Sequence, residues 1–108
     1  MLKILTIFVI LIHGLIHLLG FIKAFDYAEI KELKLPISKR IGLIWFFVSL
    51  LFIVAAALYL FSFKYWLLVA LVATIISQIL IVTSWQDAKF GSIINILLFF
   101  LLVLNMVI

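Results

Sequence analysis

Cysteine is absent from this 108-residue chain, and charged residues make up only 11% of it. Without thiols the chain cannot form disulfides, thiolate metal centres or dithiol redox sites. A soluble domain usually carries about 25% charged residues. Because 70% of the residues here are hydrophobic, the composition excludes an ordinary soluble domain, and we expect an integral membrane protein.

Four uncharged runs account for nearly all of the chain, at residues 4–22, 41–63, 65–86 and 90–108. Each is close to the ~20 helical residues that cross a bilayer core. The first run is longer than the ~7–15 residues of a signal-peptide core and has no small-residue cleavage site after it, so we expect a retained helix. The predicted fold class is all-α: one integral membrane antiparallel four-helix bundle, with spans at about 3–23, 41–62, 65–85 and 91–108.

Basic residues are divided unequally between the two sides of such a bundle. Both termini and the second connection share one side, which carries Lys3 and Lys64. The other side carries Lys23, Lys31, Lys34, Lys39, Arg40 and Lys89. The excess of lysine and arginine marks the cytoplasmic side, which predicts a protein of the cytoplasmic (inner) membrane with both termini outside. These residues lie at span ends, where they meet lipid head groups, and we expect no nucleic-acid binding.

The first connection is long enough for structure of its own. Asp26 and Glu29 have the spacing of a capping box, and Pro36 is a stop signal. Tyr27, Ile30 and Leu33 recur at helical spacing, which predicts a short amphipathic helix on the membrane face. An irregular charged loop is the alternative. Ser38 is placed to cap the second span.

Polar and small residues recur on one face of each of the first three spans. The stripes are Thr6, His13, His17 and Gly20; then Gly42, Trp45, Ser49, Phe52 and Ala56; then Thr74, Gln78 and Trp85. In a membrane such residues gather at helix contacts, because a polar side chain facing hydrocarbon loses its hydrogen bonds. We therefore expect all three stripes to face the interior.

These stripes predict a polar layer in the inner half of the bilayer. The candidate ligand-binding residues are His13, His17, Trp45, Ser49, Gln78, Trp85 and Asn95. In one interpretation they line a cavity for a polar head group, with Trp45 and Trp85 as its aromatic wall. In the other interpretation, five of these residues only bond to one another, at ~0.6 kcal/mol per contact: His13, His17, Ser49, Gln78 and Asn95. Lys23 and Lys89 anchor the chain at the lipid surface or, alternatively, hold an anionic head group.

The sequence disfavours a metal or haem centre. His13 and His17 share one helix face, but Zn²⁺ takes three or four protein ligands, and bis-histidine haem needs ligands on opposite faces of the porphyrin. No Ser-His-Asp set, phosphate loop or paired membrane carboxylates stand in the sequence, so we lean against an enzyme and assign no catalytic residue.

Two strings, HGLIHLLGFIKAF and SQILIVTSWQDAKFGSIIN, give the chain a family resemblance. With them it resembles uncharacterised bacterial four-helix membrane proteins labelled DoxX-like. The resemblance implies that these residues stand at motif positions: His13, His17, Gly20, Lys23, Trp85, Gln86, Asp87, Lys89, Gly91 and Asn95. The wider group resembles a small subunit of a quinol-oxidising complex, which implies a quinone or lipid as ligand. In the second string we expect Asp87 to cap the fourth span and Gly91 to lie where helices pack.

The leading functional prediction is a non-enzymatic membrane module. It binds a lipid-like or quinone-like molecule, or a partner membrane protein, through the inner polar layer. A small proton-linked transporter acting as a homodimer is one alternative, because histidine titrates near neutral pH. A structural assembly factor is the other.

Overall fold

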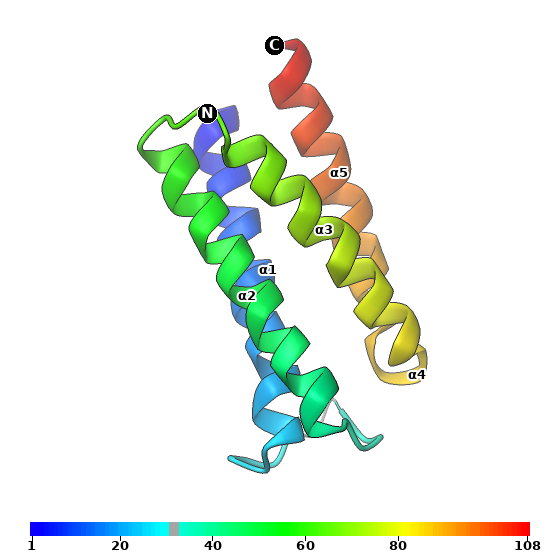
Figure 1. The fold of residues 1–108 in the computed structure, drawn as a ribbon. Coiled ribbons are helices and arrows are strands. Elements are labelled where there is room, and N and C mark those ends of the chain that lie inside the picture. Colours follow the sequence, from blue (N-terminus) through cyan, green and yellow to red (C-terminus); the bar gives the residue numbers. More distant parts are fainter. Residues whose placement is uncertain (31–32) are drawn as a thin grey trace.

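The structure is a computed structural model that describes residues 1–30 and 33–108. Its helices are α1 (Leu2–Ala24), α2 (Lys39–Leu60), α3 (Trp66–Thr83), α4 (Trp85–Ala88) and α5 (Gly91–Val107). α4 is a single turn between α3 and α5, and the other helices are long (Figure 1). The described residues contain no strand, which confirms the all-α prediction for them.

Three of the helices are long and apolar enough to cross a membrane. These are α1, α2 and α3, with mean hydropathies of 2.4, 2.7 and 2.4 over their most apolar windows. α5 is also apolar but has 17 residues. Large apolar side chains cover the outward surface of the long helices, among them Phe8, Phe47, Ile75, Phe99 and Phe100. This is the surface that suits a hydrocarbon solvent.

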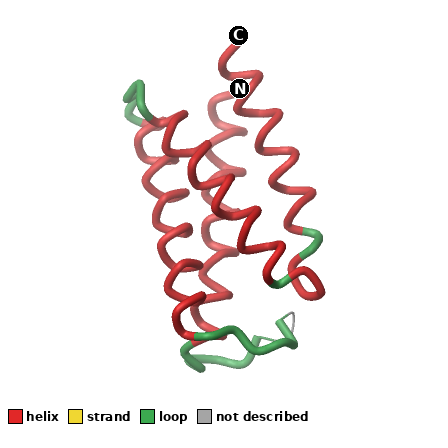
Figure 2. The backbone as a smooth tube through the Cα atoms, turned by 45° about the vertical axis from the view of Figure 1, so that its right-hand side comes forward, coloured by secondary structure: helices red, strands yellow, loops and turns green. Residues whose placement is uncertain are grey.

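Each long helix has two main neighbours among the described residues. α1 contacts α2 along most of its length, α2 contacts α3, and α5 closes the set against α3 and α1. Both termini and the α2–α3 turn lie at one end, here called the terminal end, while the α1–α2 loop and α4 lie at the other, the loop end (Figure 1). Figure 2 shows the same division from a second side. The α1–α2 loop therefore lies at the same end as α4 and the start of α5.

The interior stripes predicted for the first two spans are confirmed. All four residues on α1 and all five on α2 are buried. Glycine allows the close approach of these two helices: a Cβ on Gly14 would lie 2.8 Å from the Cβ of Phe52, and one on Gly20 would collide with the Trp45 ring. Small residues at such contacts are typical of helix pairs in membranes.

The short amphipathic helix predicted for the first loop is wrong for the described residues there. Residues 25–30 and 33–38 are turn, bend or irregular backbone, and positions 31 and 32 of that prediction lie outside the described residues. Asp26 does not start a helix but ends α1: its φ is 56°, and the Tyr27 N–H donates to the Ile22 carbonyl at 3.1 Å. A left-handed residue followed by a hydrogen bond that reaches back five residues is the Schellman motif, a common helix C-terminus.

Two further capping predictions have different outcomes. Ser38 caps α2, because its hydroxyl accepts from the Ile41 N–H at 3.2 Å. Asp87 does not cap α5, which starts four residues later without a side-chain cap. Its carboxylate instead accepts from the Leu35 N–H at 2.7 Å. This hydrogen bond connects the α1–α2 loop to α4.

Candidate functional site

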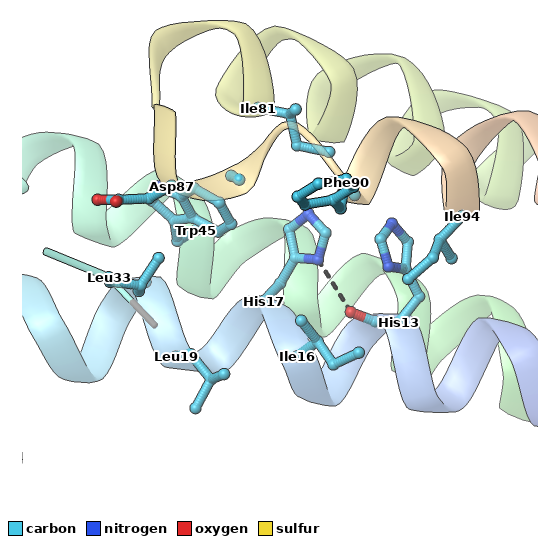
Figure 3. Close-up of a pocket in the computed structure, with 13 residues that line it drawn as sticks. His13, Ile16, His17, Leu19, Leu33, Trp45, Ile81, Asp87, Phe90 and Ile94 are labelled. Atoms are coloured by element: carbon cyan, nitrogen blue, oxygen red, sulfur yellow. Dashed lines mark hydrogen bonds between the residues drawn. The ribbon is translucent and has the colours of Figure 1, made fainter. Parts of the chain in front are cut away.

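Two buried histidines of α1 form the centre of the site. His13 and His17 are each 1% exposed, and their ring centroids lie 4.6 Å apart. His17 Nδ1 donates to the His13 carbonyl oxygen at 2.9 Å (Figure 3). This bond holds the His17 ring in one orientation. Because a carbonyl oxygen can only accept, the bond also places a proton on Nδ1.

Helices α3 and α5 supply the partners of both rings. The Ser77 hydroxyl donates to His17 Nε2 at 2.7 Å, and His13 Nε2 donates to Asn95 Oδ1 at 2.8 Å. Asn95 Nδ2 donates to Ser77 Oγ at 3.1 Å and to Gln78 Oε1 at 3.0 Å. Gln78 Nε2 then donates to Ser92 Oγ at 2.9 Å. We call His13, His17, Ser77, Gln78, Ser92 and Asn95 the histidine network.

The network assigns one tautomer to each ring. His17 carries its proton on Nδ1, since Nδ1 faces a carbonyl, and its Nε2 accepts from Ser77. His13 carries its proton on Nε2, since Nε2 faces the oxygen of Asn95. With one proton on each ring, every bond of the network has a donor and an acceptor.

A cavity of about 390 Å³ borders the network at the loop end. Its lining comes from α1, the start of α2, the end of α3, α4, the start of α5 and Leu33 of the first loop. Figure 3 shows His13 and Ile94 at one end of this cavity and Asp87 and Leu33 at the other. The volume lies within the ~300–1,000 Å³ range of small-molecule sites. Most of the lining residues are apolar: Ile16, Leu19, Leu33, Ile81, Ala88, Phe90 and Ile94.

Three buried polar atoms have no hydrogen-bond partner among the described residues. They are His13 Nδ1, the indole Nε1 of Trp45 and the hydroxyl of Ser49. The Trp45 ring lies on the side of His17 that faces away from His13, and the His17 and Trp45 ring centroids are 5.0 Å apart. Buried polar atoms are nearly always paired, and two of these three belong to His13 and Trp45, which line the cavity.

The structure brings together most of the residues predicted for the site. His13, His17, Gln78 and Asn95 belong to the network, and Trp45 lines the cavity. Ser49 is buried without a bond, and Trp85 is 51% exposed and outside the cavity lining. Lys23 and Lys89 are also outside the lining. Gly91 lies where helices pack, because a Cβ there would be 2.9 Å from Ile81 of α3.

Sequence reasoning missed Ser77, which contacts both histidines and Asn95. The stripe predicted on the third span was drawn through Thr74, Gln78 and Trp85. Thr74 is buried and Gln78 belongs to the network, but Trp85 is exposed and Ser77 was left out. The signal that could have found Ser77 is its spacing from Ala70 and Ala73, since all three are small, buried and on one face of α3.

A second polar cluster lies at the terminal end. The Tyr59 hydroxyl donates to Asn105 Oδ1, and Asn105 Nδ2 donates to Thr6 Oγ1 at 2.9 Å and to the Leu101 carbonyl at 2.7 Å. Thr6 in turn donates to the Leu2 carbonyl at 2.8 Å. We call Thr6, Tyr59 and Asn105 the terminal cluster. No unpaired buried polar atom is found in it.

No protein-family model, curated protein or solved structure matches this chain. Within residues 1–30 and 33–108, no three histidine or acidic residues are grouped as metal ligands.

Proposed function

We propose that this chain is an integral membrane four-helix bundle that binds a small lipid-like or quinone-like molecule at the histidine network. The observation that carries the proposal is the mostly apolar cavity of about 390 Å³ with His13, His17 and Trp45 in its lining. A mostly apolar pocket with a few convergent polar groups is the usual form of a small-molecule site.

The membrane setting of the proposal is supported by the outward apolar surface and by the lysine and arginine count. Six basic residues on the loop-end side against two on the terminal side favour a cytoplasmic loop end. In this orientation the cavity lies in the inner half of an inner membrane and both termini lie outside. The DoxX-like resemblance agrees with a quinone or lipid ligand, with no catalytic residue required.

Native mass spectrometry with an absorbance spectrum tests the proposal. Gently solubilised wild-type protein is compared with the His13→Ala/His17→Ala double variant. Asn105→Leu serves as the control, because it removes interhelical hydrogen bonds away from the cavity. We expect a stoichiometric small molecule in the wild type and in the control, and its loss from the double variant.

Other results would contradict the binding proposal. A wild-type protein that carries no small molecule would leave a partner membrane protein or an assembly role as the function. Equal retention of the molecule in all three proteins would move the binding site away from the histidines. Circular dichroism of each variant shows that loss of the molecule is not loss of the fold.

Proton-linked transport is not part of the proposal. A proton path would need a chain of polar groups between the histidine network and the terminal cluster. The buried side chains there include the apolar Ile10, Leu98 and Leu102, and the Thr74 hydroxyl donates to the Ala70 carbonyl of its own helix. Transport remains a prediction with its own test. Flux into liposomes that depends on pH and disappears in His13→Ala or His17→Ala would establish it.

A further inference from the structure

Two residues that line the cavity also belong to the outer surface of the protein. Ile16 of α1 is 41% exposed, and Phe90, which directly precedes α5, is 70% exposed. The lining residues contributed by α2, α3 and the first loop are buried instead: Trp45, Ile81 and Leu33. The cavity therefore opens between α1 and the start of α5.

The opening is continuous with the outward surface of both helices. On α1, Ile12 lies one turn before Ile16 and is exposed to nearly the same degree, 42%. On α5, Ile93 follows Phe90 by one turn and is also exposed. Residues three or four positions apart share one face of a helix. In the proposed membrane setting, this apolar face is in contact with lipid.

The opening lies at the depth of lipid chains and not of head groups. Ile16 precedes Lys23 by seven residues, so at ~1.5 Å per residue it lies ~10 Å deeper in the bilayer. At the loop end of the cavity, Leu33 is buried in the lining, and the Leu35 N–H donates to the Asp87 carboxylate of α4 (Figure 3). The segment from Leu33 to Leu35 thus lies over that end.

The lining favours a hydrocarbon chain over water as the occupant. Most of the lining residues are apolar, whereas a buried water needs about two to four polar partners. An empty space loses the dispersion contacts of the atoms around it, and a chain entering from the bilayer restores them. The volume of about 390 Å³ is near the lower end of small-molecule sites, so it suits one chain and not a whole lipid.

We propose that the cavity opens sideways into the bilayer, between Ile16 and Phe90, and takes the apolar chain of a membrane-dissolved amphiphile. This inference rests on the proposed function, and it adds the route of entry and the part of the ligand that fills the cavity. An acyl chain of a phospholipid and the side chain of a quinone share this chemistry.

The fluorescence of Trp45 reports a chain in the cavity, because this side chain lines the cavity and is buried. Trp66→Phe/Trp85→Phe leaves Trp45 as the sole tryptophan of the three. This variant is reconstituted into phosphatidylcholine vesicles in which half of the lipid carries brominated chains, since bromine quenches tryptophan at close range. By mass action about half of the cavities then hold a brominated chain, and we expect Trp45 emission to fall by about half.

A matched pair of substitutions tests the route of entry. Ile16→Phe adds bulk at the opening, whereas Ile12→Phe adds the same atoms one turn away, outside the cavity lining. Both are made in the protein with the single tryptophan, and circular dichroism confirms that each is folded. We expect the quenching to be lost in Ile16→Phe and unchanged in Ile12→Phe. Equal quenching in the two variants would overturn the sideways opening.

A second probe separates the two sources of the chain. It is a benzoquinone with a terminally brominated decyl chain, compared with its bromine-free counterpart because the quinone ring also quenches tryptophan. Quenching of Trp45 by brominated phosphatidylcholine identifies an acyl chain as the occupant. Extra quenching by the brominated quinone, without quenching by the phospholipid, identifies the chain of a quinone.

The possible failures of this inference and of the proposed function are distinct. If neither brominated chain quenches Trp45, but the wild type still carries a molecule that the double histidine variant loses, the chain proposal is wrong and the binding proposal stands. An empty wild-type protein whose Trp45 no brominated chain quenches would overturn both.

Discussion

The histidine network and the terminal cluster are made from the same kinds of side chain but use them differently. In the terminal cluster, Asn105 bonds Thr6 and Tyr59, and no buried polar atom is left over. In the histidine network, Asn95 bonds three side chains, yet His13 Nδ1 stays unpaired beside a cavity. In the terminal cluster, side chains and carbonyls of the helices themselves supply the hydrogen-bond partners, so no ligand is needed. The histidine network has both space and unused hydrogen-bonding capacity, which is why we place the binding site there.

Filling the cavity should have the largest effect, because it removes the space that distinguishes the histidine network from the terminal cluster. Ile94 lines the cavity, whereas its neighbour Ile93 is 63% exposed on the outer surface. Ile94→Phe occupies ligand space without touching a hydrogen bond, and we expect retention of the bound molecule to fall at least ~10-fold, or ~1.4 kcal/mol. Ile93→Phe adds the same atoms outside. Native mass spectrometry measures both, and equal retention would show that the cavity is not the site.

Removing the central asparagine of each cluster should give a smaller, unequal effect on stability. Asn95→Leu leaves the buried His13 N–H and the Ser77 hydroxyl short of partners, at a cost of ~1–3 kcal/mol. Asn105→Leu leaves the Tyr59 hydroxyl without its acceptor. Because this hydroxyl lies in a partly exposed region, we expect the free energy of unfolding to fall by less than ~1 kcal/mol. Unfolding of each variant in mixed micelles gives the difference. A larger loss for Asn105→Leu would reverse the comparison.

The smallest effect is expected from Thr6→Val. Valine keeps the shape of the side chain but loses the bond from Asn105 Nδ2, a contact of ~0.6 kcal/mol in membranes. The bound molecule should be retained fully, because Thr6 lies away from the cavity. Loss of the molecule in this variant, measured by the same mass spectrometry, would mean that the two clusters are coupled.

The sequence predicted the interior of α1 and α2 because their stripes repeat over several turns. His13 and His17 lie four residues apart, and Gly42, Trp45 and Ser49 continue the same face on α2, so the period determines which side is buried. On α3 the polar residues are fewer. A stripe extended to Trp85 crosses the end of the helix at Thr83, beyond which helical periodicity no longer applies.

Local signals were less reliable where a residue had two possible roles. Asp26 has the spacing of a helix start but occupies the left-handed position that ends α1. Asp87 has the position of a cap for α5 but bonds Leu35 from another segment of the chain. The unpaired atoms of His13 and Trp45 could not be predicted at all, because they depend on how three helices meet.

The unequal lengths of the helices have a consequence for the surrounding bilayer. α2 has 22 residues and α3 has 18, so at ~1.5 Å per residue they rise ~33 Å and ~27 Å. In the proposed membrane setting, α3 is shorter than a ~30 Å hydrocarbon core, and lipid beside it would compress while lipid beside α2 would not. Such one-sided hydrophobic mismatch favours bilayers with shorter acyl chains and gives the protein a preferred side on which neighbours relieve the compression.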